Sequence, residues 1–129
     1  MTMAITHQHN TSHIQLMNMA QLLAQEAYTL PIDGQNLPDI YDQELHTIQE
    51  AALRFYDRLT LAQRDWAAWD EILLQKLRHD LKNDLNLIVG FAHLQLRDKT
   101  SPVNSQQRVV LEYLYSRGRV LASLVNSLR

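Results

Sequence analysis

Residues 77–91 read LRHDLKNDLNLIVGF, and their apolar members recur at the spacing of an α-helix. Four of them share one face of such a helix: Leu77, Leu81, Leu85 and Ile88. His79 lies about 200° around the helix from Leu81, at ~100° per residue, so we expect it to face solvent. The same outer stripe continues through Asn83, Asn86, Gly90 and His93. The segment therefore predicts an amphipathic helix with an apolar core face and a polar face that presents one histidine.

The composition favours a compact domain in a reducing compartment. The 129 residues are enough to bury a core, and 46% of them are hydrophobic. No apolar run approaches the roughly 18 residues of a membrane span, and the polar N-terminus does not resemble a secretion signal. The absence of cysteine excludes disulfides and makes the cytoplasm the expected location. A net charge of −2 argues against a dedicated nucleic-acid-binding protein.

Neither a nucleotide-binding loop nor a metal site is indicated. The three glycines, Gly34, Gly90 and Gly118, are far apart, whereas a phosphate-binding loop needs several close together. The histidines near the N-terminus lack an acid or thiol that would complete a metal site. We therefore expect this chain to bind no ATP, metal or other cofactor.

The first sixty residues divide into a tail and a helical region. We expect residues 1–11 to be a flexible tail and residues 12–60 to form an N-terminal helical region that receives an input or braces the rest. Ser12 and Gln15 form a capping box, which predicts a helix over residues 13–28. A connector that contains two prolines follows.

A heptad pattern begins in residues 39–73 and is typical of helices that supercoil on a partner. Its members alternate at spacings of three and four: Leu45, Ile48, Ala52, Phe55, Leu59, Ala62, Trp66, Trp69 and Leu73. Past Leu73 the apolar residues follow at steps of four, a stutter that locally unwinds a coiled coil just before His79. We favour one long helix over residues 39–91. A capping box of Thr60 and Gln63 offers the alternative of two helices that break near Thr60.

A second amphipathic helix completes a hairpin over residues 61–129. Residues 98–101 form a turn, and Pro102 is placed as the first residue of a helix that should run to about Leu128. A short connection between two such helices predicts an antiparallel hairpin. Two helices cannot bury their apolar stripes alone, so we expect an all-α homodimer in which two hairpins form a four-helix bundle. Gly118 either permits close helix contact or is simply tolerated.

His79 has neighbours that suit a nucleophile. A neutral imidazole is nucleophilic and exists near physiological pH. The Asp80 carboxylate could accept a hydrogen bond from Nδ1 and leave Nε2 as the attacking atom. Asn83, one turn further on, could orient a water, and Lys82 is placed to contact a phosphate or a docking acid. The alternative is an ordinary surface histidine, one of six, but the long preceding helix and the hairpin favour the functional interpretation.

The sequence HDLKN at residues 79–83 resembles the H-box of two-component sensor histidine kinases. The resemblance to their dimerisation and phosphoacceptor domain covers about residues 69–129 and includes LASLVNSL at 121–128. It implies a homodimeric four-helix bundle with His79 as the phosphoacceptor, Asp80 as the assisting acid and Asn83 in support of phosphatase activity. The preceding heptad helix is similar to the signalling helices that feed such domains.

Two departures from the family pattern affect the implied function. The family commonly has a proline five residues after the histidine, where this chain has Asp84, which permits a regular helix. A kinase would also continue beyond Arg129 into an ATP-binding domain. If the chain is complete, the resemblance implies a stand-alone histidine phosphotransferase that exchanges phosphoryl groups with receiver-domain aspartates. If it is a piece of a longer protein, it is the phosphoacceptor core of a larger kinase or of a multidomain signalling protein.

The implied partner is a response-regulator receiver domain, with a histidine kinase as a second candidate. The residues expected to dock this partner are Lys82, Asn86, Gly90 and His93. The Mg²⁺ needed for transfer is expected on the receiver. A competing interpretation is a non-catalytic dimerisation, signal-transmission or kinase-inhibitory module in which His79 is never phosphorylated. The joint presence of His79, Asp80 and Asn83 favours phosphotransfer.

Overall fold

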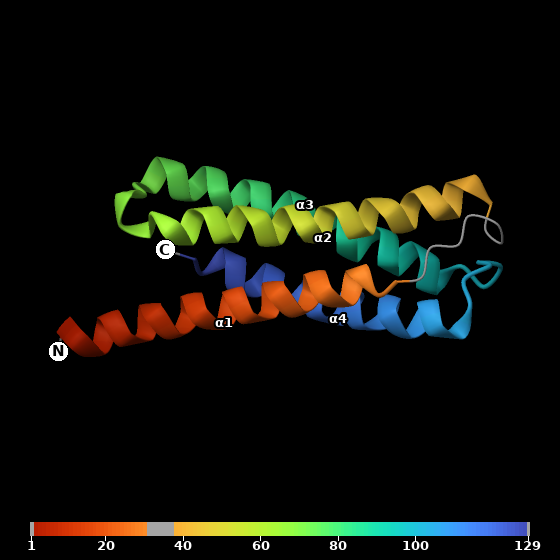
Figure 1. Ribbon diagram of the computed structural model, residues 1–129, viewed down its shortest axis with the longest axis horizontal. Coiled ribbons are helices and arrows are strands. Elements are labelled where there is room, and N and C mark those ends of the chain that lie inside the picture. Colours follow the sequence, from red (N-terminus) through yellow and green to blue (C-terminus); the bar gives the residue numbers. More distant parts are fainter. Residues whose placement is uncertain (1, 31–37, 129) are drawn as a thin grey trace.

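Four helices of one chain form an antiparallel bundle in the computed structural model (Figure 1). The structure describes the backbone of residues 2–30 and 38–128 and the side chains of residues 13–30 and 38–128. The helices are α1 (Thr2–Tyr28), α2 (Asp39–Arg64), α3 (Glu71–Arg97) and α4 (Ser105–Asn126). Each packs on the next, and α1 packs on α4, which closes the ring. The described residues contain no strand, so the prediction of an all-α fold with a C-terminal helical hairpin is confirmed.

The predicted apolar stripes form the core between the four helices. In α3 the buried side chains include Leu77, Leu81, Leu85, Ile88 and Ala92. In α2 the heptad positions from Leu45 to Ala62 are buried. Full burial of one such leucine or isoleucine stabilises the fold by roughly 1.5–3 kcal/mol. Within the described residues, no helix is long and apolar enough to cross a membrane.

The helix predicted over residues 39–91 is broken, so the prediction of continuity was wrong. α2 ends at Arg64, because the next residue, Asp65, leaves the helical conformation with φ −135° and ψ 38°. α3 begins after Asp70, whose carboxylate accepts a hydrogen bond from the Leu73 N–H at 2.9 Å. Between them lies a short 3₁₀ helix, η1 (Trp66–Ala68). The chain therefore reverses here, and α3 packs antiparallel to α2.

The alternative break near Thr60 was also wrong. The Thr60 hydroxyl donates to the Tyr56 carbonyl at 2.9 Å within α2 instead of capping a new helix. The predicted division between residues 60 and 61 consequently falls inside α2. Trp66 and Trp69, which we assigned to the continuing seam, are half-buried within the turn.

Two helix starts also differ from the prediction. α1 begins at Thr2, so residues 2–11 are helical where we expected a tail, and Ser12 lies inside the helix. Figure 1 shows this part of α1 reaching past the ends of the other helices, where an apolar face would have nothing to pack against. α4 begins after Asn104 instead of at Pro102. Asn104 and Gln107 form a capping box, in which each side chain accepts a hydrogen bond from the backbone N–H of the other.

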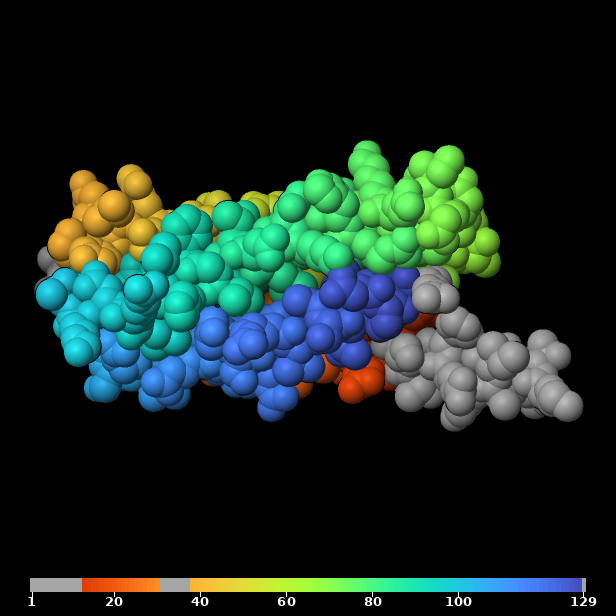
Figure 2. Space-filling model, turned by 180° about the vertical axis from the view of Figure 1, so that it is seen from behind, coloured from red at the N-terminus to blue at the C-terminus, as the bar shows by residue number. Residues whose placement is uncertain are grey.

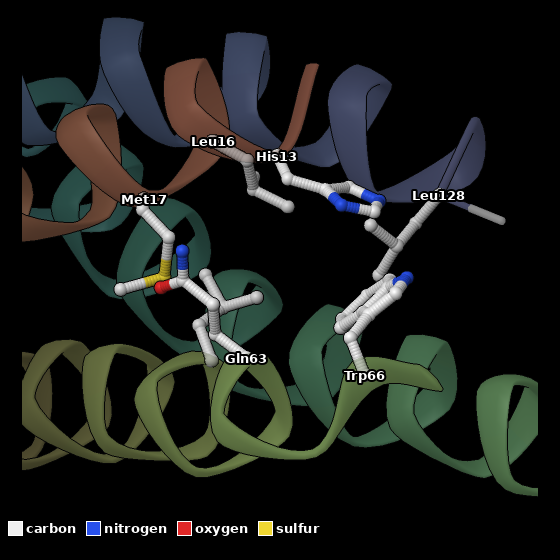
Figure 3. Close-up of a pocket in the computed structure, with 7 residues that line it drawn as sticks. His13, Leu16, Met17, Gln63, Trp66 and Leu128 are labelled. Carbon is white, nitrogen blue, oxygen red and sulfur yellow. The ribbon is translucent and has the colours of Figure 1, made fainter. Parts of the chain in front are cut away.

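The N-terminal hairpin (α1 and α2) and the C-terminal hairpin (α3 and α4) meet near the C-terminus. The His13 ring of α1 lies 4.2 Å from the Trp66 ring, measured between centroids. Leu128 points toward the same space from the end of the chain (Figure 3). The residues that line this small pocket come from α1, α2, η1 and the C-terminus: His13, Leu16, Met17, Leu59, Gln63, Trp66 and Leu128. The N-terminal hairpin thus packs on the C-terminal one at this end of the bundle.

The N-terminal hairpin occupies the place that we assigned to a second copy. α1 and α3 run parallel on one diagonal of the bundle, and α2 and α4 on the other (Figure 1). Buried positions of α1 and α3 recur in the sequence at a separation of 65 residues: Leu16 and Leu81, Ala20 and Leu85, Leu23 and Ile88, and Ala27 and Ala92. In this register the position that matches His79 is Ile14, which is 55% exposed. One chain supplies all four helices, and association with a second copy stays a prediction.

Candidate functional site

His79 lies on the outer side of α3, two turns after the Asp70 cap. Figure 2 shows the face of the molecule to which α3, in green to teal, and α4, in blue, both contribute. The other predicted members of the outer stripe are exposed as well: Asn83, Asn86, Gly90 and His93. Lys82, beside them, is also exposed. The structure therefore brings the predicted histidine, amide and docking residues onto one accessible side of α3.

Asp80 differs from His79 in that it lies partly buried toward α2. Its backbone carbonyl accepts a hydrogen bond from Arg58 Nη1 at 3.1 Å. Among the residues that the structure describes, no hydrogen bond joins His79 to Asp80. The contact that would fix the imidazole tautomer is thus not formed in this conformation, and the role of Asp80 stays a prediction.

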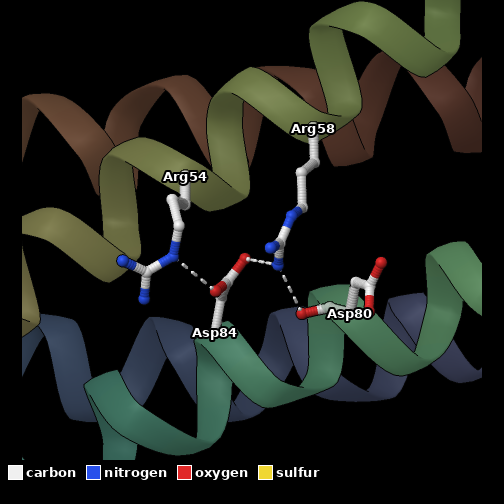
Figure 4. A network of polar contacts seen from close by, with 4 residues as sticks. All are labelled: Arg54, Arg58, Asp80 and Asp84. Carbon is white, nitrogen blue, oxygen red and sulfur yellow. Dashed lines mark hydrogen bonds and ion pairs between the residues drawn. The ribbon is translucent and has the colours of Figure 1, made fainter.

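Asp84 is a buried carboxylate that the sequence analysis did not identify as part of the site. Its side chain is 3% exposed and lies between two arginines of α2 (Figure 4). Arg54 Nε donates to Oδ1 at 3.1 Å, and Arg58 Nη1 donates to Oδ2 at 2.7 Å. A buried charge is costly unless it is paired and hydrogen-bonded, and the two arginines give the Asp84 carboxylate both kinds of contact. α3 runs without a break through Asp84. This agrees with the prediction that aspartate permits a regular helix where the family commonly has a proline.

A signal for this ion pair was present in the sequence. Asp84 follows Leu81 by three residues and precedes Ile88 by four, which places it on the apolar face of α3. Arg54 and Arg58 are four residues apart, one turn of a helix, and so project from the same side of α2. The pairing itself could not be inferred, because it depends on the turn that lays α2 against α3.

His93 takes part in an aromatic cluster near the other end of the stripe. Its ring stacks on Tyr115 of α4 with centroids 5.3 Å apart, and the Arg119 guanidinium lies 5.6 Å from the Tyr115 centroid.

Gly90 is open, because a Cβ built there would meet no atom within 4 Å. A partner that covers His79 can thus approach α3 closely at Gly90.

An open groove of about 340 Å³ runs beside Asp80 between α2 and α3. Its floor is apolar, from Ala62, Trp69 and Leu77 among others, and Arg58, Lys76 and Asp80 provide its charges. Two of its lining residues, Leu61 and Leu73, are exposed. The groove adds an apolar surface next to the histidine-bearing turn.

No metal site is formed by the described side chains. Within that part of the chain, no three histidine, aspartate or glutamate residues gather closely enough to hold an ion. His79 presents an exposed imidazole, with the Asn83 amide one turn away and the paired carboxylate of Asp84 toward the interior of the bundle. A neutral imidazole is a nucleophile.

Comparison with known proteins agrees with this reading of α3 and α4. Residues 71–129 match the family model described as the His Kinase A (phospho-acceptor) domain. Neither the curated proteins nor the solved structures gave a significant match to this chain.

Proposed function

Because residues 71–129 match the family model described as the His Kinase A (phospho-acceptor) domain, we propose that this chain is a phosphotransfer protein of two-component signalling. In this proposal His79 is the phosphoacceptor, and the partner is a receiver domain whose aspartate gives or takes the phosphoryl group. The observation that carries the proposal is the exposed position of His79 on α3 within the matched segment.

The transfer follows from the chemistry of imidazole. The lone pair of His79 Nε2 attacks phosphorus while Nδ1 keeps its proton. The bond between phosphorus and the aspartyl oxygen breaks, and its electrons leave with the receiver carboxylate. The reverse step returns the phosphoryl group to an aspartate. Such transfers depend on alignment of the two reacting groups and on neutralisation of the phosphoryl charge.

The neighbouring residues have supporting roles in the proposal. Asp80 accepts a hydrogen bond from Nδ1 when the partner docks, and Asn83 orients a water for dephosphorylation. Four exposed residues contact the partner: Lys82, Asn86, Gly90 and His93. Mg²⁺ is supplied by the receiver, and transfer takes place in the cytoplasm. The resemblance implies a homodimer, but one chain already closes its own bundle, so the proposal does not require a second copy.

The test is a phosphotransfer assay with phosphorylated receiver domains from the same organism. We expect the wild type to acquire an acid-labile, alkali-stable label and His79→Gln to acquire none. His46→Gln is the matched control, because His46 is an exposed histidine on α2 and is not one of the proposed docking residues. It should retain the label.

Two results would count against the proposal. One is a label that survives in His79→Gln. The other is no label from any receiver or cognate kinase while circular dichroism shows an intact helical fold. The second result would favour a non-catalytic module that binds a kinase or receiver through the same outer stripe.

A further inference from the structure

Arg58 connects α2 to the turn of α3 that carries His79. A single nitrogen, Nη1, donates to the Asp84 carboxylate at 2.7 Å and to the Asp80 carbonyl at 3.1 Å (Figure 4). Arg54 donates to the Asp84 carboxylate alone, at 3.1 Å. Arg58 thus holds both the backbone and a side chain of α3, whereas Arg54 holds only the side chain.

These contacts restrain the rotation of α3 about its own axis. Apolar packing is non-directional, so the leucines of α3 tolerate a small rotation better than hydrogen bonds do. His79 and Asp80 are adjacent, at ~100° on the helix, and any rotation of Asp80 is shared by the imidazole. The Arg58 contact therefore sets the direction in which His79 points from the bundle.

We infer that Arg58 is a positioning residue for phosphoryl exchange at His79. The inference rests on the function proposed above and adds that the exchange depends on α2, which lies outside the matched segment 71–129. Alignment errors of about 1 Å can slow a reaction by roughly 100-fold. Loss of the Arg58 contacts should accordingly slow transfer from a docked receiver by roughly 10- to 100-fold.

Arg54→Met is a matched control for Arg58→Met. Both substitutions keep an apolar stem, remove one guanidinium from Asp84, and lie one turn apart on α2. The two side chains are similarly exposed, at 44% for Arg54 and 37% for Arg58. Only Arg58→Met also removes the bond to the Asp80 carbonyl. If ion pairing with Asp84 were all that mattered, the two variants would behave alike.

The experiment compares the full-length wild type, Arg54→Met and Arg58→Met with two phosphoryl donors. The first donor is a phosphorylated receiver, used over a range of concentrations to separate kcat from KM. The second is phosphoramidate, a small donor that needs no docked protein. We expect Arg58→Met to lower kcat with the receiver by at least tenfold at unchanged KM, and Arg54→Met to stay within about threefold of the wild type. Both variants should react with phosphoramidate at the wild-type rate.

Hydrogen exchange supplies a readout that does not depend on activity. The amides of residues 79–84 should exchange faster in Arg58→Met than in Arg54→Met, and Arg58→Lys, which restores a donor, should recover part of the protection. Equal transfer rates and equal exchange in the two methionine variants would overturn the positioning role but leave the phosphotransfer function standing. A wild type that neither donor labels at His79 would overturn both.

Discussion

At the level of single residues, Asp98 follows the last residue of α3, and its carboxylate makes several hydrogen bonds there. Its carboxylate accepts hydrogen bonds from the Thr100 hydroxyl at 2.7 Å, from the Thr100 N–H at 2.9 Å and from the Tyr41 hydroxyl at 3.3 Å. These bonds, the Thr100 hydroxyl first, hold the pKa of Asp98 below its ordinary value of 3.8. A depressed pKa means that this stabilisation is fully present above pH ~4 and is lost as pH falls through the folded-state pKa.

Replacing Thr100 should therefore move the titration of Asp98. Thr100→Val keeps the shape and the backbone N–H but removes the hydroxyl, so we expect the Asp98 pKa to rise toward its ordinary value. Tyr41→Phe removes the smaller contribution and should raise that pKa by less. Carboxyl ¹³C chemical shifts followed against pH measure both. A Thr100→Val protein whose Asp98 titrates as in the wild type would contradict the assignment.

The sequence predicted which site residues are exposed but not what lies behind them. His79, Asn83 and His93 were placed correctly, because the 3.6-residue period fixes which side of a helix a residue occupies. Arg58 contacts Asp80 and Asp84, which lie 22 and 26 residues further along the chain. No local sequence pattern specifies such a long-range contact. Sequence reasoning thus identified the exposed histidine but not the arginine contacts that hold the other side of α3.

At the level of helices, α3 and α4 lie close together at Gly118. A Cβ built on Gly118 would lie 2.6 Å from Val89 Cγ2, far inside van der Waals contact. This contact decides between the two interpretations left open from sequence. Gly118 permits close packing of α3 and α4.

Alanine at the two helical glycines should have opposite effects on stability. Gly118→Ala gains about 1 kcal/mol of helix propensity but forces Val89 to move, and valine is stiff in a helix. We expect a net loss of about 1–2 kcal/mol in the free energy of unfolding. Gly90→Ala meets no neighbour and should gain roughly 0.5–1 kcal/mol. Urea denaturation measures both, and Val89→Ala should rescue Gly118→Ala. A gain in Gly118→Ala equal to that in Gly90→Ala would show that the helices are not in contact there.

Helix boundaries were the least predictable feature at this scale. The heptad pattern continues through Trp66 and Trp69, and it therefore favoured one long helix across a turn that the structure places between Asp65 and Asp70. Both tryptophans do pack against the core, but from the turn. Our sequence analysis did not use Asp70, which caps α3 in the structure, although aspartate is among the strongest N-cap residues.

For the whole molecule, the structure changes the expectation for assembly. Residues 13–30 and 38–64 bury the stripes of α3 and α4 that we assigned to a second copy. We therefore expect sedimentation equilibrium to give the mass of one 15.0 kDa chain. A mass of two chains, unchanged on dilution, would show that the homodimer forms through the outer surface.

A fragment of residues 66–129 provides the complementary measurement. It lacks α1 and α2 and exposes the apolar faces of α3 and α4, as two helices alone cannot enclose them. We expect it to be helical only at concentrations where it self-associates. Helix content that is independent of concentration would show that the hairpin is stable without its neighbours.

The fold class was predictable because periodicity reports which faces are apolar, and the C-terminal hairpin followed from its short turn. The identity of the covering helices was not predictable. An amphipathic stripe specifies that something apolar must lie against it, without saying whether the cover comes from the same chain or from another. Here residues 13–30 and 38–64 provide that cover.

The match between Ile14 and His79 has a genetic consequence. In a homodimer of identical hairpins, one mutation in the gene changes both copies. Each copy must therefore carry the histidine and also pack against the other copy. In this chain the two halves are encoded separately, so a substitution in α1 or α2 leaves its counterpart in α3 or α4 untouched. Selection can therefore change the N-terminal half independently of the C-terminal half. The bundle has one histidine at this position, His79, and Ile14 at the matching position.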